Sequence, residues 1–221
     1  MTKHPDDLLH DVHEHLVLPS STVNVKLVSG QYSYYHYSCD GINDQCWGCG
    51  YRSLQTVCSW IYYQNTQSTR LVTVPSVYEI QNALVIVKDK PSTFLNSKEW
   101  IGSVEVGLCI DYFYDVPCKI HHVRQDEHLK DHARVLQEHF SSFGSPVMMG
   151  GDVDAASKCI LGICETNHSE ILVLVLDPHF TSVQNCEELV KKQMLSWRRL
   201  DMFDKSSFYN FCLPQLKSSC L

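Results

Sequence analysis

The sequence predicts a single domain of the α+β class, with its helices early in the chain and its strands late. Of its 221 residues, 44% are hydrophobic and 19% are charged, which is the composition of a globular protein. Apolar residues recur at helical spacing after Cys49, whereas residues 171–176 form an uninterrupted aliphatic run that is typical of a buried strand. This separation of helices from strands is typical of α+β proteins.

The first part of the chain is predicted to be a polar leader followed by strands. Residues 1–20 are mainly polar, so we expect a flexible leader, and residues 21–221 contain no repeat or linker that would divide them into two domains. Residues 22–29 alternate between apolar and polar, as a half-buried strand does. Residues 31–38 are rich in aromatic side chains and predict a second strand, which could pair with the first across Gly30.

Periodicity and capping signals divide the rest of the chain into helices and strands. A loop over residues 39–50 leads into a helix of roughly four turns that begins at Cys49. Ser76 and Glu79 match a capping box, which predicts a second helix to about residue 85. Further helices are expected at residues 103–114, 126–140 and 187–197, and strands at residues 147–149, 158–164, 171–176 and 208–213.

Charge and composition exclude several classes of protein. The formal net charge of −7 gives no electrostatic support to nucleic-acid binding. The longest aliphatic run, residues 171–176, is far shorter than the ~20 residues of a membrane helix, and the polar N-terminus lacks the apolar core of a signal peptide. Eleven cysteines cannot all pair with one another. These features predict a cytoplasmic protein with free thiols, no membrane span and no nucleic-acid partner.

The densest chemical signal is a cysteine between two glycines in WGCGYR, residues 47–52. Glycines permit a tight turn and the close approach of a substrate backbone. The N-terminus of the following helix offers partial positive charge and unpaired N–H groups, which favour a thiolate and can stabilise an oxyanion. We therefore interpret Cys49 as a nucleophile, although free cysteines are most often small core residues.

Two other functions are open for the same segment. His36, Cys39, Cys46 and Cys49 have the spacing H-x2-C-x6-C-x2-C, which could bind zinc. Against zinc, Cys49 would have to act as a ligand from the start of a helix, and the predicted strand that carries His36 is rich in aromatic residues. Cys46 and Cys49 could instead form a redox pair, but no thioredoxin-like pattern surrounds them. The interpretation that we carry forward needs no metal and no cofactor.

A cysteine nucleophile needs a histidine to move its proton and a third group to orient the imidazole. Among twelve histidines, His179 stands out because it follows Asp177 and Pro178 directly after the aliphatic run. Residues i and i+2 project to the same face of an extended chain, and a proline favours that conformation in the residue before it. The two side chains would start roughly 6–7 Å apart, so a carboxylate can reach the imidazole. The alternative is a strand-ending turn, since Asp-Pro often starts a turn. Most other histidines lie in the leader or on the predicted 126–140 helix, and His121 and His122 are expected just after a strand.

With these motifs identified, the sequence resembles the ubiquitin-fold-modifier-specific proteases, and most of all the short form of that family. The resemblance rests on WGCGYR at residues 47–52 and DPH at residues 177–179, and it extends over most of residues 30–180. It implies a papain-like cysteine protease fold, in which an N-terminal catalytic helix packs on an antiparallel sheet. The predicted domain of residues 21–221 would then be a single peptidase domain.

The same resemblance implies roles for individual residues. Cys49 is the expected nucleophile, His179 the base and Asp177 the group that orients it. Tyr37 is similar to the family's oxyanion-hole tyrosine. Trp47 and Trp100 are candidates for the roof of a narrow groove that admits a glycine-ended tail, although either could equally pack in the core.

The implied reaction is proteolysis after a glycine, with ubiquitin-fold modifier 1 as the partner. The precursor of the modifier would be trimmed at its C-terminus, and the modifier would be removed from lysine side chains of conjugated proteins. Autophagy-type proteases share the WGC and DPH layout but usually carry Met after the cysteine, and a related deubiquitinase branch places its histidine elsewhere. A non-catalytic protein that binds the modifier is the remaining alternative, and the full set of catalytic residue types argues against it.

Overall fold

The computed structural model describes residues 8–64, 73–153, 156–182 and 185–218. Its α-helices are α1 (Cys49–Gln64), α2 (Val77–Ile86), α3 (Ser103–Tyr114), α4 (Ala133–Ser142) and α5 (Cys186–Lys191). Its strands are β1 (Thr22–Leu27), β2 (Cys118–Val123), β3 (Val147–Gly151), β4 (Ser157–Thr166), β5 (Ile171–Leu176), β6 (Leu195–Arg199) and β7 (Tyr209–Pro214). Short 3₁₀ turns lie at Val12–His15, Ser92–Phe94, Leu129–His132 and Leu200–Met202.

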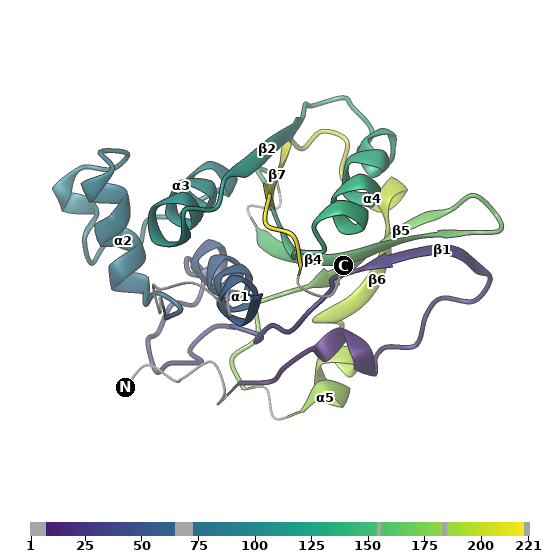
Figure 1. Ribbon diagram of the computed structural model, residues 1–221, viewed down its shortest axis with the longest axis horizontal. Helices are drawn as coiled ribbons and strands as arrows, with labels where there is room; N and C mark the ends of the chain where they lie inside the picture. Colours follow the sequence, from purple (N-terminus) through teal and green to yellow (C-terminus); the bar gives the residue numbers. More distant parts are fainter. Residues whose placement is uncertain (1–7, 65–72, 154–155, 183–184, 219–221) are drawn as a thin grey trace.

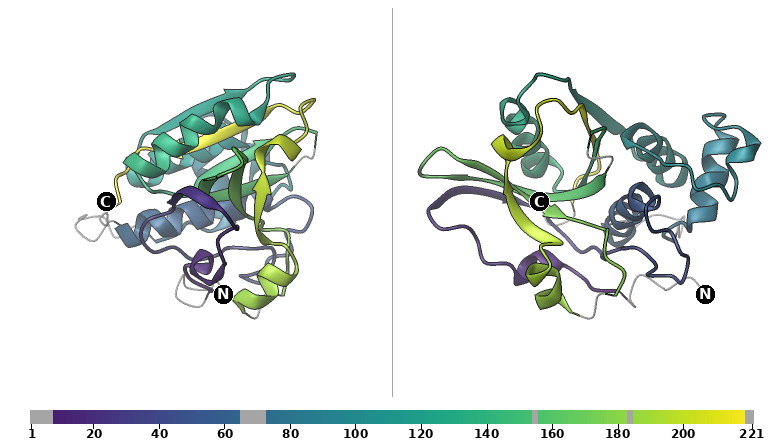
Figure 2. Two further views of the ribbon diagram at one scale, coloured as in Figure 1. Left: turned by 90° about the vertical axis from the view of Figure 1, so that its right-hand side faces the viewer. Right: turned by 180° about the vertical axis from the view of Figure 1, so that it is seen from behind.

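The strands form one antiparallel sheet with helices on both faces. Across the described part of the chain, the strand order is β2-β7-β3-β4-β5-β6, and β1 pairs with the second half of β4. The last strand in the sequence, β7, therefore lies inside the sheet, between β2 and β3. α1 and α3 cover one face and α4 covers the other, while α2 lies outside α3 (Figures 1 and 2). The predicted α+β class is confirmed.

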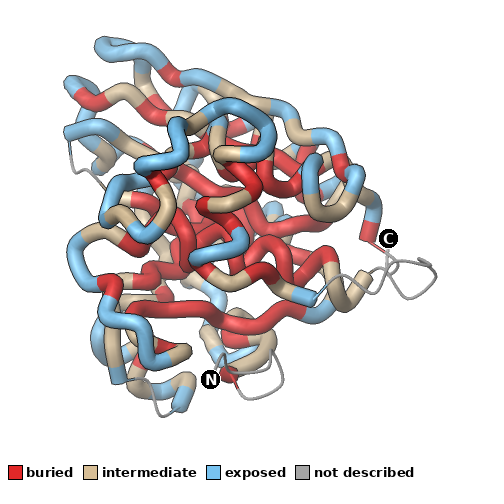
Figure 3. The backbone as a smooth tube through the Cα atoms, turned by 90° about the vertical axis from the view of Figure 1, so that its left-hand side faces the viewer, coloured by how far each residue is buried: buried red, intermediate tan, exposed pale blue. Residues whose placement is uncertain are grey.

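Alternating side chains of the central strands build a core on each face of the sheet. On β4, Cys159 and Leu161 join the cluster that contains α1, whereas Ile160 joins the cluster that contains α4. Ile163 also lies on the α4 side, because the pairing with β5 is irregular between Ile160 and Gly162 and shifts the alternation. Figure 3 shows the resulting run of buried chain through the centre of the molecule.

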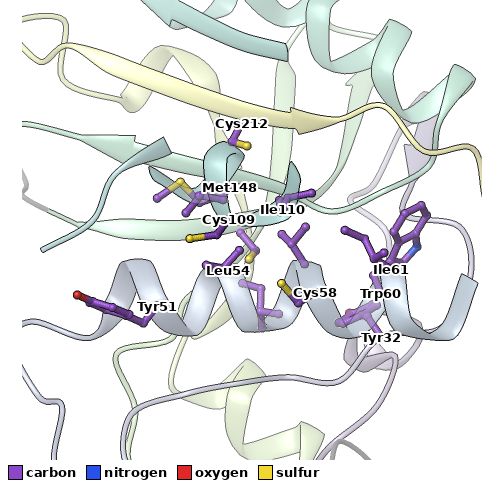
Figure 4. Close-up of a cluster of buried hydrophobic side chains, with 14 of the residues drawn as sticks. Tyr32, Tyr51, Leu54, Cys58, Trp60, Ile61, Cys109, Ile110, Met148 and Cys212 are labelled. Carbon is purple, nitrogen blue, oxygen red and sulfur yellow. The ribbon is translucent and has the colours of Figure 1, made fainter. Parts of the chain in front are cut away.

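α1 is the helix most completely enclosed by other elements. Every residue from Cys49 to Ile61 is buried, and Figure 4 shows Leu54 on this helix beside Cys109 of α3. Trp60 is fully buried, yet its indole nitrogen donates a hydrogen bond to the carbonyl of Ser29 at 2.8 Å. Burying a side chain of this size stabilises the fold by on the order of 3 kcal/mol. The residue at the start of α1 is thus held on a rigid support.

Residues 31–38 do not form the predicted strand. Among the residues described, this segment makes only an isolated bridge at Ser33, and β1 pairs with β4 rather than with it. Two of its backbone donors bond to side chains of α1 instead, from the Ser33 N–H to Ser59 Oγ at 2.9 Å and from the Tyr35 N–H to Thr56 Oγ1 at 3.1 Å. At these two positions, buried hydroxyl groups on α1 take the place of a neighbouring strand.

Two of the predicted helices are shorter in the structure. The 3₁₀ turn Leu129–His132 replaces the first part of the helix predicted at residues 126–140, and α4 begins only at Ala133. The helix predicted at residues 187–197 ends at Lys191, because the chain then enters β6 and pairs with β5. Tertiary pairing has overridden the local helical pattern in this second case.

Besides β6, the strand β2 was not predicted, and two histidines were therefore misplaced. His121 and His122 lie within β2 and pair with Phe211 and Asn210 of β7, rather than following a strand. β2 is at the edge of the sheet and shows no clean alternation of buried and exposed residues. Its pairing depends on β7, which is far away in the sequence, so a local pattern could not reveal it.

The other predicted elements are confirmed, with ends that differ by only a few residues. The capping box of α2 is present, with the Glu79 N–H bonded to the side chain of Ser76. Residues 1–7 of the predicted leader lie outside the described residues, and its flexibility stays a prediction. From residue 8 onward the chain packs against the domain, with Val12 fully buried. None of the helices in the described ranges is long and apolar enough to cross a lipid bilayer.

Candidate active site

Cys49 is the first residue of α1, and the glycines on both sides of it are required by internal packing. A Cβ on Gly48 would lie 2.3 Å from Asp44 Oδ2, and one on Gly50 would lie 2.4 Å from the carbonyl oxygen of Ile101. This packing lets the preceding loop and the segment before α3 close around the candidate nucleophile, which is only 6% exposed. That the glycines also admit a substrate backbone stays a prediction.

Asp177 and His179 follow β5 and face one another. Asp177 Oδ1 accepts hydrogen bonds from the backbone N–H of His179 at 3.0 Å and from its ring Nδ1 at 2.5 Å. The backbone of Asp177 is fixed on both sides, since its N–H donates to the carbonyl of Met194 at 2.7 Å and its carbonyl accepts from the Tyr34 hydroxyl at 2.6 Å. The carboxylate fixes the tautomer of the imidazole and leaves Nε2 to act on another group.

The imidazole of His179 is hydrogen-bonded to the Cys49 thiol, although the two residues come from opposite halves of the chain. Burial alone would raise the pKa of Cys49, but the hydrogen bonds from His179 and Ser157 lower it below its ordinary value. Burial opposes the charged form of His179, yet Asp177 and Cys49 raise its pKa to about 9. The pKa of Asp177 is lowered, because the contacts with His179 outweigh the cost of burial. These directions favour a thiolate beside an imidazolium.

Ser157 is a contact of Cys49 that the sequence did not indicate. Its backbone N–H and its side-chain hydroxyl both form hydrogen bonds with the sulfur. The residue begins β4 and is buried, and it lines the same hollow as Cys49. Only the pairing of β4 within the sheet brings it to the helix terminus, so no local motif in the sequence could mark it.

Tyr37 lies beside both members of the candidate catalytic pair. Its ring contacts the ring of His179 edge to face, with centroids 5.2 Å apart, and its backbone N–H donates to the carbonyl of Pro178 at 3.0 Å. Burial and the neighbouring Cys49 hold the pKa of its hydroxyl well above the ordinary value. The hydroxyl therefore keeps its proton and can donate a hydrogen bond close to the sulfur.

A narrow hollow of about 230 Å³ opens in front of Cys49. It lies between the segment before α3 and the ends of β3, β4 and β7, and its lining residues are Cys49, Trp100, Ile101, Gly102, Ser103, Gly150, Gly151, Asp152, Ala156, Ser157, Phe208 and Asn210. Trp100 is 55% exposed, and its indole nitrogen donates to the carbonyl of Cys46 at 3.2 Å. Trp47 is not part of this lining; it is half-buried and its ring contacts that of Tyr51.

The residues of the alternative zinc motif are not gathered into a ligand set. Cys39 is buried and Cys46 is exposed, while His36 Nδ1 bonds to the carbonyl oxygen of Tyr37 at 2.9 Å. No three histidine, cysteine, aspartate or glutamate side chains among the described residues are grouped so that they could hold a metal ion. The structure thus brings Cys49, His179, Asp177 and Tyr37 together, with Trp100 at the rim. Their catalytic roles stay predictions.

Comparisons with known proteins agree on one family of relatives. Mouse Ufm1-specific protease 1 is 43% identical over 213 residues, which are 95% of this chain and 95% of that protein. Human Ufm1-specific protease 2 is 40% identical over 212 residues, which are 95% of this chain but 44% of that protein. A crystal structure of UfSP from C. elegans superposes with a TM-score of 0.82 at 32% identity, over 98% of this chain and 38% of that one. This chain therefore spans almost all of the first relative and less than half of the other two.

The profile of peptidase family C78 matches residues 23–212, which include the loop before α1, the end of β5 and all seven strands apart from the outermost residues of β1 and β7. The family resemblance and the papain-like α+β fold expected from the motifs are both confirmed by these matches. This chain belongs to peptidase family C78.

Proposed function

We propose that this peptidase is a cysteine protease that cleaves after the C-terminal glycine of ubiquitin-fold modifier 1. The observation that carries the proposal is the hydrogen-bonded series from Cys49 through His179 to Asp177, because it supplies a nucleophile, a proton carrier and an orienting carboxylate. The choice of modifier is supported by the relatives, which are Ufm1-specific proteases.

In the proposed mechanism, the Cys49 thiolate attacks the carbonyl carbon of the terminal glycine. The Tyr37 hydroxyl and the backbone N–H of Cys49, at the N-terminus of α1, stabilise the oxyanion that forms. The His179 imidazolium gives its proton to the leaving amine, which leaves an acyl thioester on Cys49. The neutral imidazole then takes a proton from water, and the resulting hydroxide releases the modifier as a free carboxylate.

The hollow in front of Cys49 supports a substrate with a small C-terminal residue. Gly102, Gly150 and Gly151 line it, and they leave little side-chain bulk near the sulfur. Trp100 lies at the mouth, where a flat ring can cover an extended tail, whereas Trp47 lies outside this lining. Both leaving groups fit the same chemistry, since a peptide amine in the precursor and a lysine amine in a conjugate each accept one proton. We therefore propose both maturation and deconjugation, in a reducing compartment such as the cytoplasm.

Direct cleavage tests this proposal. Wild-type protein is incubated with a modifier precursor that carries a C-terminal extension, with a lysine-linked conjugate, and with matched ubiquitin and autophagy-type modifier substrates. Mass spectrometry is expected to show cleavage of the first two after the terminal glycine, at rates at least about 100-fold above the others. A modifier with a C-terminal electrophile is expected to form an adduct on Cys49. An intact precursor, or preferential cleavage of ubiquitin, contradicts the proposed function.

The pH dependence of turnover follows from the two shifted groups. The pKa of His179 is raised to about 9, so its proton is present below that pH and is lost above it. The pKa of Cys49 is lowered, so the thiolate forms below the ordinary thiol value of 9.0 and persists at higher pH. We expect kcat/KM to rise as Cys49 ionises, reach a plateau and fall as the pH passes about 9, whereas alkylation of Cys49 by iodoacetamide does not fall there. Turnover that climbs steadily from pH 8 to 10 contradicts this assignment.

A further inference from the structure

An ionic cluster is buried directly behind the candidate nucleophile. Arg52, on the first turn of α1, is fully buried, and its Nε donates to Asp44 Oδ2 at 2.5 Å. Its two terminal nitrogens each donate to one oxygen of Asp40 at 2.8 Å, and one of them also donates to Gln55 Oε1 at 2.9 Å. The guanidinium is thus held by two carboxylates, one of them bidentate.

The cluster connects the segment that carries Tyr37 with the segment that carries Cys49, and these two residues supply the proposed donors to the oxyanion. Asp44 Oδ1 accepts a hydrogen bond at 2.8 Å from the backbone N–H of Ser38, the residue after Tyr37. The carbonyl of Asp44 accepts another at 2.8 Å from the N–H of Gly48, the residue before Cys49. The side chain of Asp44 therefore fixes the residue after Tyr37, and its backbone fixes the residue before Cys49.

The far side of Tyr37 is tied to the candidate base. The backbone N–H of Tyr37 bonds to the carbonyl of Pro178, immediately before His179. Tyr37 is accordingly held between two anchors, one from the Asp44 cluster beside Cys49 and one from the end of β5. If the first anchor were loosened, the hydroxyl could move relative to the sulfur while the contact with Pro178 persisted.

Charges buried to this extent are costly, and well-packed apolar residues can often replace a buried ion pair without loss of stability. A cluster of this kind is therefore weak support for a purely stabilising role. Its geometry is directional, because a planar guanidinium with two fixed carboxylates permits little displacement of the loop over residues 38–48. Tyr37 directly precedes this loop, so a fixed loop also fixes the place of the Tyr37 hydroxyl in the site.

We propose that Arg52, together with Asp40 and Asp44, is a positioning cluster that holds the Tyr37 hydroxyl in register with Cys49 for stabilisation of the oxyanion. This inference rests on the proposed function. A displacement of about 1 Å at such a donor can reduce a rate by up to about 100-fold, so a partial loosening of the clamp has a measurable effect on turnover.

Asp40→Asn is the variant that tests the cluster. It keeps the shape of the side chain and the Arg52–Asp44 contact, but it removes the bidentate acceptance by Asp40. We expect kcat for precursor cleavage to fall about tenfold, with KM nearly unchanged, because the weakened hydrogen bond to the oxyanion forms in the transition state and not in the bound substrate. The rate of Cys49 alkylation by iodoacetamide, a reaction that forms no oxyanion, is expected to stay within about twofold of wild type.

A double-mutant cycle with Tyr37→Phe separates positioning from general damage. In the Tyr37→Phe background, Asp40→Asn is expected to lower kcat by less than about twofold, because the donor that the cluster positions is already gone. Arg52→Lys, which keeps the charge but loses the planar fork, provides a second variant with the same expected dependence on Tyr37. Arg134→Met is the matched control, since Arg134 forms an exposed ion pair with Glu138 on α4.

Each result has a defined meaning. If wild type does not cleave the precursor, the proposed function fails, and the positioning role fails with it. If wild type cleaves but Asp40→Asn has normal kcat, or loses as much in the Tyr37→Phe background, or slows alkylation to the same degree, the positioning role alone is overturned. Thermal unfolding monitors the fold of each variant. Unfolding of both Asp40→Asn and Arg52→Lys at 25 °C makes the cluster a requirement of the fold and also overturns the proposal.

Discussion

Replacement of Cys49 by alanine is expected to lower kcat/KM for precursor cleavage by at least about 10⁴-fold. Loss of the nucleophile in a catalytic triad removes the covalent route altogether and leaves only the weaker contributions of binding and the oxyanion donors. Cys49 is buried on the rigid first turn of α1, so the truncation should change chemistry far more than fold. Product formation measured by mass spectrometry over hours covers this range of rates.

Cys46→Ala is the matched control, because it removes an exposed thiol three positions before Cys49, in the loop that leads into α1. We expect its turnover to stay within about twofold of wild type. Cys49→Ala should still bind the modifier, since the hollow and Trp100 are untouched. Residual activity within tenfold of wild type would contradict the nucleophile assignment, and activity lost in the Cys46→Ala variant instead would move it to that residue.

Asp177→Asn is expected to lower kcat by about 10⁴-fold, as loss of the orienting carboxylate does in an established catalytic triad. Asp177 Oδ1 holds both the ring Nδ1 and the backbone N–H of His179, while Oδ2 lies 3.9 Å from Arg198. An amide keeps the shape but not the charge, so the imidazolium loses its counter-ion and the pKa of His179 falls from about 9. Stopped assays across pH measure both the loss of rate and the shift of the alkaline limb to lower pH.

An exposed carboxylate provides the control for this variant. Asp201 pairs with Arg199 at 2.6 Å on the surface, and Asp201→Asn is expected to leave kcat and the pH profile unchanged. The thiolate should also be affected in Asp177→Asn, with slower alkylation of Cys49 at neutral pH, because a less basic imidazole stabilises it less. A variant that loses activity without any change in the alkaline limb would show that Asp177 supports only the fold.

Much of the helical half of the structure could be predicted from the sequence, because its signals are local. The apolar residues that recur after Cys49 lie on one surface of α1, and the capping box of α2 is formed by residues three positions apart. The Asp177–His179 geometry was equally predictable, since residues i and i+2 of an extended chain share a face and the preceding aliphatic strand is buried.

The features that could not be predicted all depend on partners far away in the sequence. β2 exists because β7 pairs with it, and two backbone donors of the segment at residues 31–38 bond to side chains of α1 rather than to a strand. Ser157 reaches Cys49 only through the assembled sheet. The packing roles of Gly48 and Gly50 could likewise not be predicted, because their close neighbours, Asp44 and the carbonyl of Ile101, are visible only in three dimensions.

The position of β7 inside the sheet has a consequence for biosynthesis. A ribosome releases β2 and β3 long before β7, so neither strand meets its shared neighbour until almost all of the described chain has emerged. During synthesis, β2 and β3 each therefore have an unpaired backbone edge exposed. Their pairing with β7 joins residues that are far apart in the sequence, and such pairing makes folding slow. A truncated translation product that stops before residue 209 should be an aggregation-prone fragment, even though it would contain every residue of the candidate triad.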